Sequence, residues 1–115
     1  MYTTLVTIGR NVGATPMSGD EWQAFKRSVL DLLMALAWRT AEGTSEGWYL
    51  SDSEGRGFWD GLAEDNYTVT LIHENRFTPA NYEEMRNELK ILAARYRQDA
   101  IALIGEVQAD LVPAS

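Results

Sequence analysis

Residues 17–36 read MSGDEWQAFKRSVLDLLMAL, and this stretch carries the clearest structural signal in the chain. Ser18 is followed three residues later by Glu21, which is the spacing of a capping box at the start of a helix. Apolar residues then recur at steps of three and four, which places them along one side of a helix. They are Trp22, Phe25, Val29, Leu32, Leu33 and Leu36. We therefore predict a helix over residues 19–37 with one buried face.

Strand patterns lie on both sides of this helix. Thr3 to Ile8 is rich in β-branched residues and ends at Gly9, which predicts a strand in the centre of a sheet. From Tyr67 to Glu74 the side chains alternate between two faces, so we predict a second strand there. A third strand is expected from Ala100 to Ile104, followed after Gly105 by a bent edge segment.

A second helix is predicted to begin near Thr78 and Pro79, because proline suits the first turn of a helix. Asn81 and Glu84 have the spacing of another capping box. The apolar stripe of this helix consists of Tyr82, Met85, Leu89, Leu92 and Tyr96.

The middle of the chain, from Trp38 to Gly61, shows no helical period. It holds five of the nine glycines and three of the four tryptophans. We predict one or two short strands around residues 48–50 and 58–59, joined by a turn over residues 51–55.

The order strand, helix, strands, helix, strand is that of the α+β ferredoxin-like βαββαβ sandwich, with both helices on one face of an antiparallel sheet. We expect a single domain over residues 1–115. Four segments resemble an uncharacterised family of small ferredoxin-like domains from bacteria and phages. They are residues 9–11, 17–25, 67–73 and 96–101. The resemblance leaves out residues 42–61 and implies a fold without an established activity.

Composition excludes several kinds of chemistry. The chain has no cysteine, so disulfides, zinc ribbons and thiol nucleophiles are excluded. The net charge of −7 disfavours direct binding to nucleic acid, which requires clustered Lys and Arg. No segment has the pattern of a secretory signal or a membrane span, so we expect a cytoplasmic protein with no cofactor and no membrane partner.

His73 is the single histidine and therefore the first candidate for a general base. In that role it would need polar partners such as Arg10, Asn11 or Tyr67 to polarise a substrate. The competing interpretation is a partly buried histidine at a strand end, hydrogen-bonded to a neighbour. One histidine with scattered carboxylates lacks the ligand spacing of a zinc site, so no metal is expected.

Aromatic and acidic residues gather in the middle segment. A small-molecule pocket with aromatic walls could be formed by Trp48, Trp59, Tyr49 and Phe58, with Asp60 and Glu64 beside them. Packing between neighbouring strands is the alternative explanation for these aromatic residues.

The charge is concentrated in the same segment. Between residues 42 and 65 there are seven acids and one base, Arg56. This stretch either keeps the protein soluble or provides an interaction surface for a basic partner, with Glu46, Asp52 and Glu54 as contact residues. Arg10 and Asn11, in the glycine-bearing turn after the first strand, could bind an anion or reach across a dimer interface to the acidic stretch.

Three classes of function stay open from the sequence. The first is a phage-like, non-enzymatic accessory or inhibitory protein that binds a partner protein through its acidic surface. The second is an oligomeric protein that binds or sequesters a small ligand, and the third is a cofactor-free enzyme that uses His73. A homodimer is expected because one face of the sheet, carrying Leu5 or Val6 and Ile72, is left uncovered by the two helices.

Overall fold

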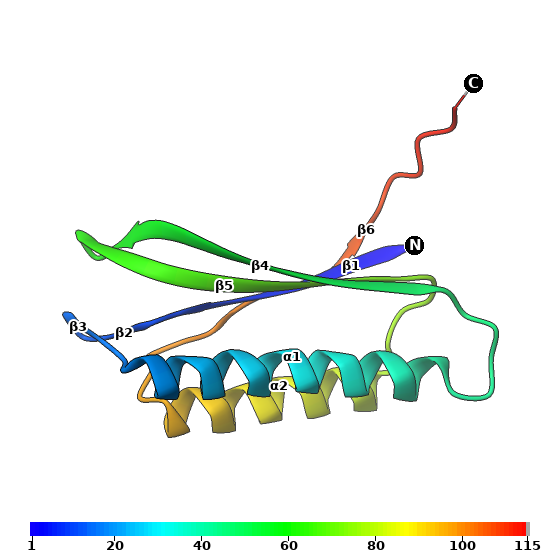
Figure 1. The fold of residues 1–115 in the computed structure, drawn as a ribbon. Helices are drawn as coiled ribbons and strands as arrows, with labels where there is room; N and C mark the ends of the chain where they lie inside the picture. The colour runs from blue at the N-terminus through cyan, green and yellow to red at the C-terminus, as the bar shows by residue number, and fades with distance from the viewer. Residues whose placement is uncertain (115) are drawn as a thin grey trace.

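Two helices lie side by side on one face of a four-stranded antiparallel sheet (Figure 1). The computed structural model describes residues 1–114. The strands follow the spatial order β4-β5-β1-β6. Their bounds are Tyr2–Gly9 for β1, Trp48–Trp59 for β4, Leu62–His73 for β5 and Ala102–Gln108 for β6. This order confirms the predicted ferredoxin-like α+β fold.

Helix α1 spans Gly19–Ala41 and begins where the sequence predicts. The Ser18 hydroxyl accepts a hydrogen bond from the Glu21 backbone N–H at 3.2 Å, while the Glu21 carboxylate pairs with Arg97 and does not complete the box. The helix continues four residues beyond the predicted end at residue 37. Gly43 follows it in a left-handed conformation, with φ +73°, which suits the position just after a helix.

Helix α2 spans Pro79–Arg95, and its start corrects one prediction. The cap is Thr78, whose hydroxyl accepts a hydrogen bond from the Asn81 N–H at 3.1 Å. The box predicted at Asn81 and Glu84 is therefore wrong, because Asn81 already lies inside the helix. Glu84 instead pairs with Arg39 of α1 and ties the two helices together. Neither helix has the length and hydropathy needed to cross a bilayer in the part of the chain that the structure describes.

The middle segment forms one long hairpin. Residues 51–55 pair in register with β5, from Ser51 opposite Thr70 to Gly55 opposite Asn66, so the turn predicted there is wrong. The actual turn is Asp60-Gly61, with φ values of +54° and +75°. Asp-Gly is a preferred pair for a two-residue hairpin turn, in which both residues need positive φ. Strand β5 consequently starts at residue 62, five residues before its predicted start.

Strand β6 covers less than the region predicted for it. It begins at residue 102, and its register against β1 shifts between Thr3 and Leu5, which is a β-bulge next to Gly105. A small hairpin precedes α1, in which β2, Asn11–Val12, pairs with β3, Thr15–Pro16.

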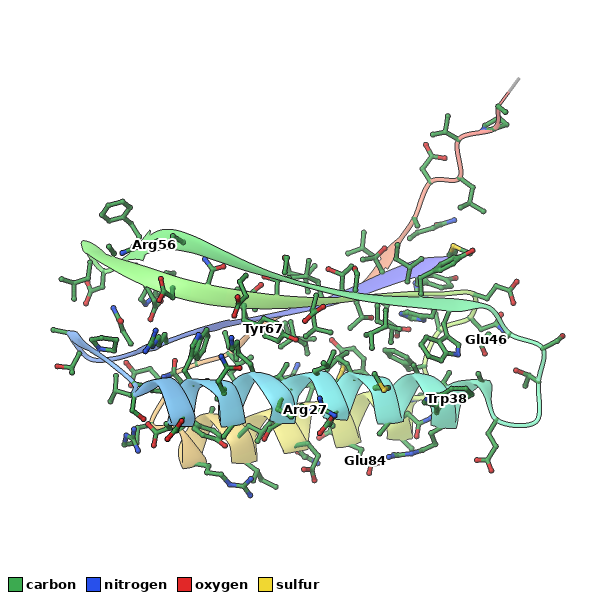
Figure 2. All side chains as sticks on the ribbon, viewed as in Figure 1. Arg27, Trp38, Glu46, Arg56, Tyr67 and Glu84 are labelled. Atoms are coloured by element: carbon green, nitrogen blue, oxygen red, sulfur yellow. The ribbon has the colours of Figure 1, made fainter. Side chains whose placement is uncertain are left out.

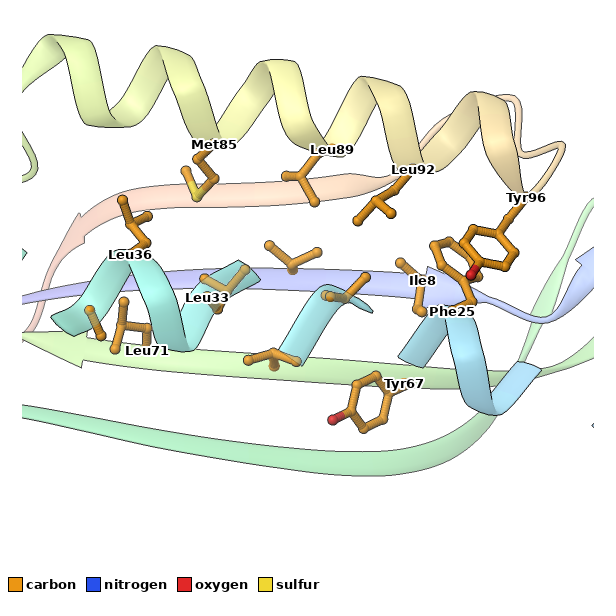
Figure 3. Close-up of a cluster of buried hydrophobic side chains, with 14 of the residues drawn as sticks. Ile8, Phe25, Leu33, Leu36, Tyr67, Leu71, Met85, Leu89, Leu92 and Tyr96 are labelled. Atoms are coloured by element: carbon orange, nitrogen blue, oxygen red, sulfur yellow. The ribbon is translucent and has the colours of Figure 1, made fainter. Parts of the chain in front are cut away.

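The core lies between the sheet and the helices (Figure 3). The sheet contributes alternate residues of its two central strands, and each helix contributes its apolar stripe. Phe25 of α1 stacks on Tyr96 at the end of α2, with ring centroids 4.4 Å apart. The largest fully buried apolar side chains are Phe25, Leu33, Leu71, Met85, Val6, Val29 and Val69. This packing leaves the opposite face of the sheet without a covering layer.

The hairpin turn yields a direct test of the corrected topology. Gly61→Ala should lower the free energy of unfolding by about 1 kcal/mol, because a side chain at positive φ is strained. Gly19→Ala is the matched control, since Gly19 begins α1 and an added Cβ meets no atom within 4 Å. Urea unfolding followed by circular dichroism measures both. Equal stability of the two variants would contradict a tight turn at residue 61.

Candidate functional site: an aromatic corner at the end of helix α1

The structure separates the residues that the sequence grouped into one aromatic pocket. Trp48 and Trp59 begin and end β4, eleven residues apart. At ~3.3 Å per residue this places them about 36 Å from each other. Trp59 and Asp60 lie at the hairpin tip, whereas Trp48 lies at the other end of the molecule. The predicted pocket of Trp48, Trp59, Asp60 and Glu64 is therefore wrong, because the segment is one extended strand.

His73 lies inside the core, with 2 % of its surface exposed. Its Nδ1 lies 2.7 Å from the carbonyl oxygen of Asn75, so Nδ1 carries the proton and donates it. Its Nε2 lies 3.0 Å from the Thr4 hydroxyl, and the ring stacks on Phe77 at 4.2 Å. Both nitrogens are engaged by the protein. This geometry favours the structural interpretation of His73 over a role as general base.

The acidic stretch is largely satisfied within the chain. Within residues 1–114, five of its seven carboxylates have a partner, and Glu42 and Asp60 are the other two. Two carboxylates form ion pairs: Glu54 with Lys26, and Asp65 with both Arg10 and Arg56. The other three accept hydrogen bonds: Asp52 from the Tyr67 hydroxyl, Glu64 from the Asn11 N–H and Glu46 from the Asn75 N–H. Cations neutralise two of these carboxylates, Glu54 and Asp65, whereas the other three accept hydrogen bonds from neutral donors and keep their charge.

Arg10 and Asn11 tie the end of β1 to the β4–β5 hairpin. The Arg10 guanidinium donates to the carbonyl of Met17 at 2.9 Å and to Asp65 at 3.3 Å. The Asn11 side chain donates to the carbonyl of Ala63 at 3.1 Å. Arg10 meets the acidic stretch inside its own chain, so the idea that it reaches across a dimer interface loses its basis.

A groove of about 350 Å³ runs between α1 and β4, and its polar groups bind one another. The Lys26 ammonium lies 5.5 Å from the Trp22 ring and 5.8 Å from the Tyr67 ring, in cation–π range, and also pairs with Glu54. Burial, and then the hydrogen bond to Asp52, raise the pKa of Tyr67 well above its ordinary value of 10.0. Tyr67 is therefore a hydroxyl donor at neutral pH and not a base.

A larger cavity of about 550 Å³, open to solvent, lies at the C-terminal end of α1. Its lining includes the indole rings of Trp38 and Trp48, which pack edge to face on each other, with centroids 5.2 Å apart and planes that meet at 76°. Trp38 is 64 % exposed. In Figure 2 Trp38 and Glu46 lie together at this end of the molecule, opposite Arg56. We call this arrangement the tryptophan corner.

The remaining walls of the tryptophan corner give it a negative character. Glu42 and Glu46 line it, as does the end of α1, where the helix dipole is negative. Arg39 also lines it, but its guanidinium is paired with Glu84. The lining therefore combines aromatic rings with carboxylates, and both kinds of group attract a positive charge. Within residues 1–114 no three of His, Asp and Glu cluster closely enough to hold a metal ion.

The connection from α1 to β4 makes hydrogen bonds to the end of α1, within itself and to the residue that follows β5. The Thr44 hydroxyl donates to the carbonyl of Ala41 at 2.8 Å and accepts from the Glu46 N–H at 3.0 Å. The Gly47 N–H donates to the Glu74 carboxylate at 3.1 Å. These bonds fix Glu46 and Trp48 relative to the helix end.

Sequence reasoning found two residues of the corner, Glu46 and Trp48, and missed Trp38 and Glu42. It ended the helix at residue 37, which left Trp38 in a loop. The missed signal was Gly43, because a glycine just after the last turn is a common helix stop. Extending the helix to that stop would have placed Trp38 and Glu42 at its end, close to the strand that follows.

Comparison with known proteins gives a likeness of fold. No protein-family model and no curated protein sequence matches this chain. A phage SAM lyase in its apo state superposes with a TM-score of 0.52 and 17 % identity, covering 94 % of this chain and 84 % of the other. The complex of a phage SAM lyase with S-methyl-5′-thioadenosine gives a TM-score of 0.44 and 14 % identity, covering 89 % and 77 %. A point variant of CutA1 from Pyrococcus horikoshii OT3 gives 0.46 and 19 %, covering 99 % and 88 %.

The Tyr67–Asp52 hydrogen bond predicts a pH dependence of stability. Because the pKa of Tyr67 is raised in the folded state, the unfolded chain loses this proton first as pH rises. The free energy of unfolding should therefore fall above pH 10, and Tyr67→Phe should reduce that fall. At pH 7 the same variant should cost about 1 kcal/mol, because Asp52 loses its donor.

Urea unfolding of wild type and Tyr67→Phe at pH 7 and pH 10.5 measures both effects. Tyr2→Phe is the control, because it also removes one phenol but leaves the Tyr67–Asp52 hydrogen bond in place. An alkaline slope that is the same in wild type and Tyr67→Phe would contradict this account of Tyr67.

Proposed function

We propose that this protein binds an adenosyl sulfonium ligand of the S-adenosylmethionine type in the tryptophan corner. The observation that carries this proposal is the perpendicular pair Trp38 and Trp48 beside the carboxylates of Glu42 and Glu46. An adenine ring stacks on an indole face, and a base stacked on an aromatic side chain contributes ~1–3 kcal/mol to binding. A sulfonium is attracted both to aromatic faces and to carboxylates.

The cavity has the size and character that such a ligand needs. Its volume of about 550 Å³ lies within the range of ~300–1,000 Å³ that small-molecule sites usually have. Glu42 is exposed and free to accept hydrogen bonds from ribose hydroxyls. The shared fold with a phage SAM lyase is the reason to test S-adenosylmethionine before other onium ligands.

Isothermal titration calorimetry with S-adenosylmethionine tests the proposal, followed by S-adenosylhomocysteine, in which a neutral thioether replaces the sulfonium. We expect the charged ligand to bind more tightly. Trp38→Ala should weaken binding about tenfold to a hundredfold, the equivalent of ~1–3 kcal/mol of stacking. Trp59→Phe is the control, because Trp59 lies at the hairpin tip and should leave the affinity unchanged.

No heat of binding from S-adenosylmethionine would contradict the proposal, as would equal affinities of wild type and Trp38→Ala. Mass spectrometry of the same mixture after incubation separates a binding protein from an enzyme. Release of S-methyl-5′-thioadenosine by wild type, but not by Trp38→Ala, would extend the proposal from binding to turnover.

A second candidate function, binding of a partner protein, is favoured by the hairpin tip. Phe58 and Trp59 are 81 % and 77 % exposed there, and Leu62 adds to the apolar surface. Exposed aromatic residues of this kind dominate the energetics of protein interfaces. In this version of the accessory-protein hypothesis the contact is the apolar tip, with Asp60 at its edge, and not the acidic stretch as a whole.

Photo-crosslinking tests this second candidate. Benzoylphenylalanine in place of Phe58 should give a defined covalent adduct in the cells that naturally make the protein. The same group in place of Arg86, exposed on the outer side of α2, should not give that adduct. The same adducts from both positions, or none from position 58, would argue against a contact at the tip.

A further inference from the structure

The sheet face opposite the helices has a regular composition that follows from its register. Thr4, Val6 and Ile8 of β1 and Val69 and Leu71 of β5 are buried toward the helices, so the residues between them point the other way. The pairing aligns these residues in three rows across the four strands. The rows are Tyr49, Ile72, Thr3 and Val107; then Ser51, Thr70, Leu5 and Ile104; then Ser53, Thr68, Thr7 and Ala102. We call these twelve residues the open face.

None of the twelve residues of the open face carries a charge, although the chain has a net charge of −7. Two copies of an acidic protein repel each other through most of their surface. A surface without charged side chains is the one through which a second copy can approach without bringing carboxylates together. The charge distribution therefore favours a copy of this chain as the occupant of the open face.

The open face also carries apolar surface suited to burial. Ile104 and Val107, on the edge strand β6, are each 53 % exposed. Tyr49 lies on β4, the opposite edge strand, and is also exposed. The Thr7 and Thr68 hydroxyls bond each other at 2.9 Å, so one of their two O–H donors keeps a protein partner when water is excluded. The short Thr and Ser side chains between the apolar residues keep the surface flat enough for another sheet to pack on it.

The C-terminal segment lies on the same side. Residues 110–114 leave the sheet on the side away from the helices (Figure 1). Leu111 and Val112 in this segment are strongly exposed. A second sheet stacked on the open face would lie on the same side of the sheet as this segment.

We propose that the open face binds the open face of a second copy around a two-fold axis, giving a dimer with helices on both outer sides. Ile104 and Val107 of each copy lie in the interface of this dimer, where they are buried. The tryptophan corner is formed within one chain, so this inference is independent of the proposed ligand.

Sedimentation equilibrium of the full chain over a range of concentrations tests the proposal. Wild type should show twice the mass of one chain, and Ile104→Glu should show the mass of one chain. Ile91→Glu is the matched control, because Ile91 is similarly exposed but lies on α2, and this variant should stay dimeric. Circular dichroism establishes that each variant folds. If Ile104→Glu fails to fold, Tyr49→Lys on the same face replaces it.

Several results would overturn the proposal. The first is a wild-type protein that sediments as a monomer at ~100 µM, a concentration well above the Kd of a stable dimer. The second is an Ile104→Glu variant that keeps the wild-type mass. The third is an Ile91→Glu variant that loses association as much as Ile104→Glu does. A mass of three chains would also overturn it, because stacking around a two-fold axis joins two copies.

Discussion

Strand β1 lies in the middle of the sheet, and the direction of its side chains determines the rest of the molecule. It pairs with β5 on one side and β6 on the other. Its buried residues Thr4, Val6 and Ile8 determine which face both helices cover. A shift of one residue in this register would turn the apolar side chains toward solvent. Because side chains alternate between the two faces of the paired strands, the same register buries His73 and turns Tyr67 toward α1. It also leaves only uncharged side chains on the open face.

The length of α1 follows from the need to cover this sheet. Its apolar stripe runs along the buried face as far as Ala37, and the helix extends one more turn before Gly43 stops it. That extra turn contributes nothing fully buried, yet it brings Trp38 against Trp48. The tryptophan corner is thus made by residues that the core does not require. Exposed aromatic residues that packing does not explain are reasonable candidates for a binding role.

Most of the fold could be predicted from local patterns. The capped start of α1, the central strand and the order of elements come from signals that depend on neighbouring residues, and all three are confirmed. The long hairpin could not be found by looking for apolar runs, because β4 is mostly exposed and carries Ser, Asp, Glu and Gly. Its strand conformation comes from pairing with β5 across the Asp60-Gly61 turn.

The candidate site was harder to predict than the fold. Trp48 and Trp59 are close in the sequence to the same acids. A turn between them would have kept them close in space, but residues 48–59 form an extended strand that holds them apart. Trp38 and Trp48 are brought together by a helix end and a strand start, a contact that depends on where α1 stops. The carboxylates of the acidic stretch look free in the sequence because their partners, such as Lys26 and Asn75, lie far along the chain.

The central claim is that the tryptophan corner binds an adenosyl sulfonium ligand. Four tryptophans give four indole N–H signals in a nitrogen-15 NMR spectrum, and each can be assigned by substitution. On titration with S-adenosylmethionine the signals of Trp38 and Trp48 should move together and saturate, while those of Trp22 in the core and Trp59 at the hairpin tip stay in place. Four unchanged signals, or a response confined to Trp59, would contradict the claim.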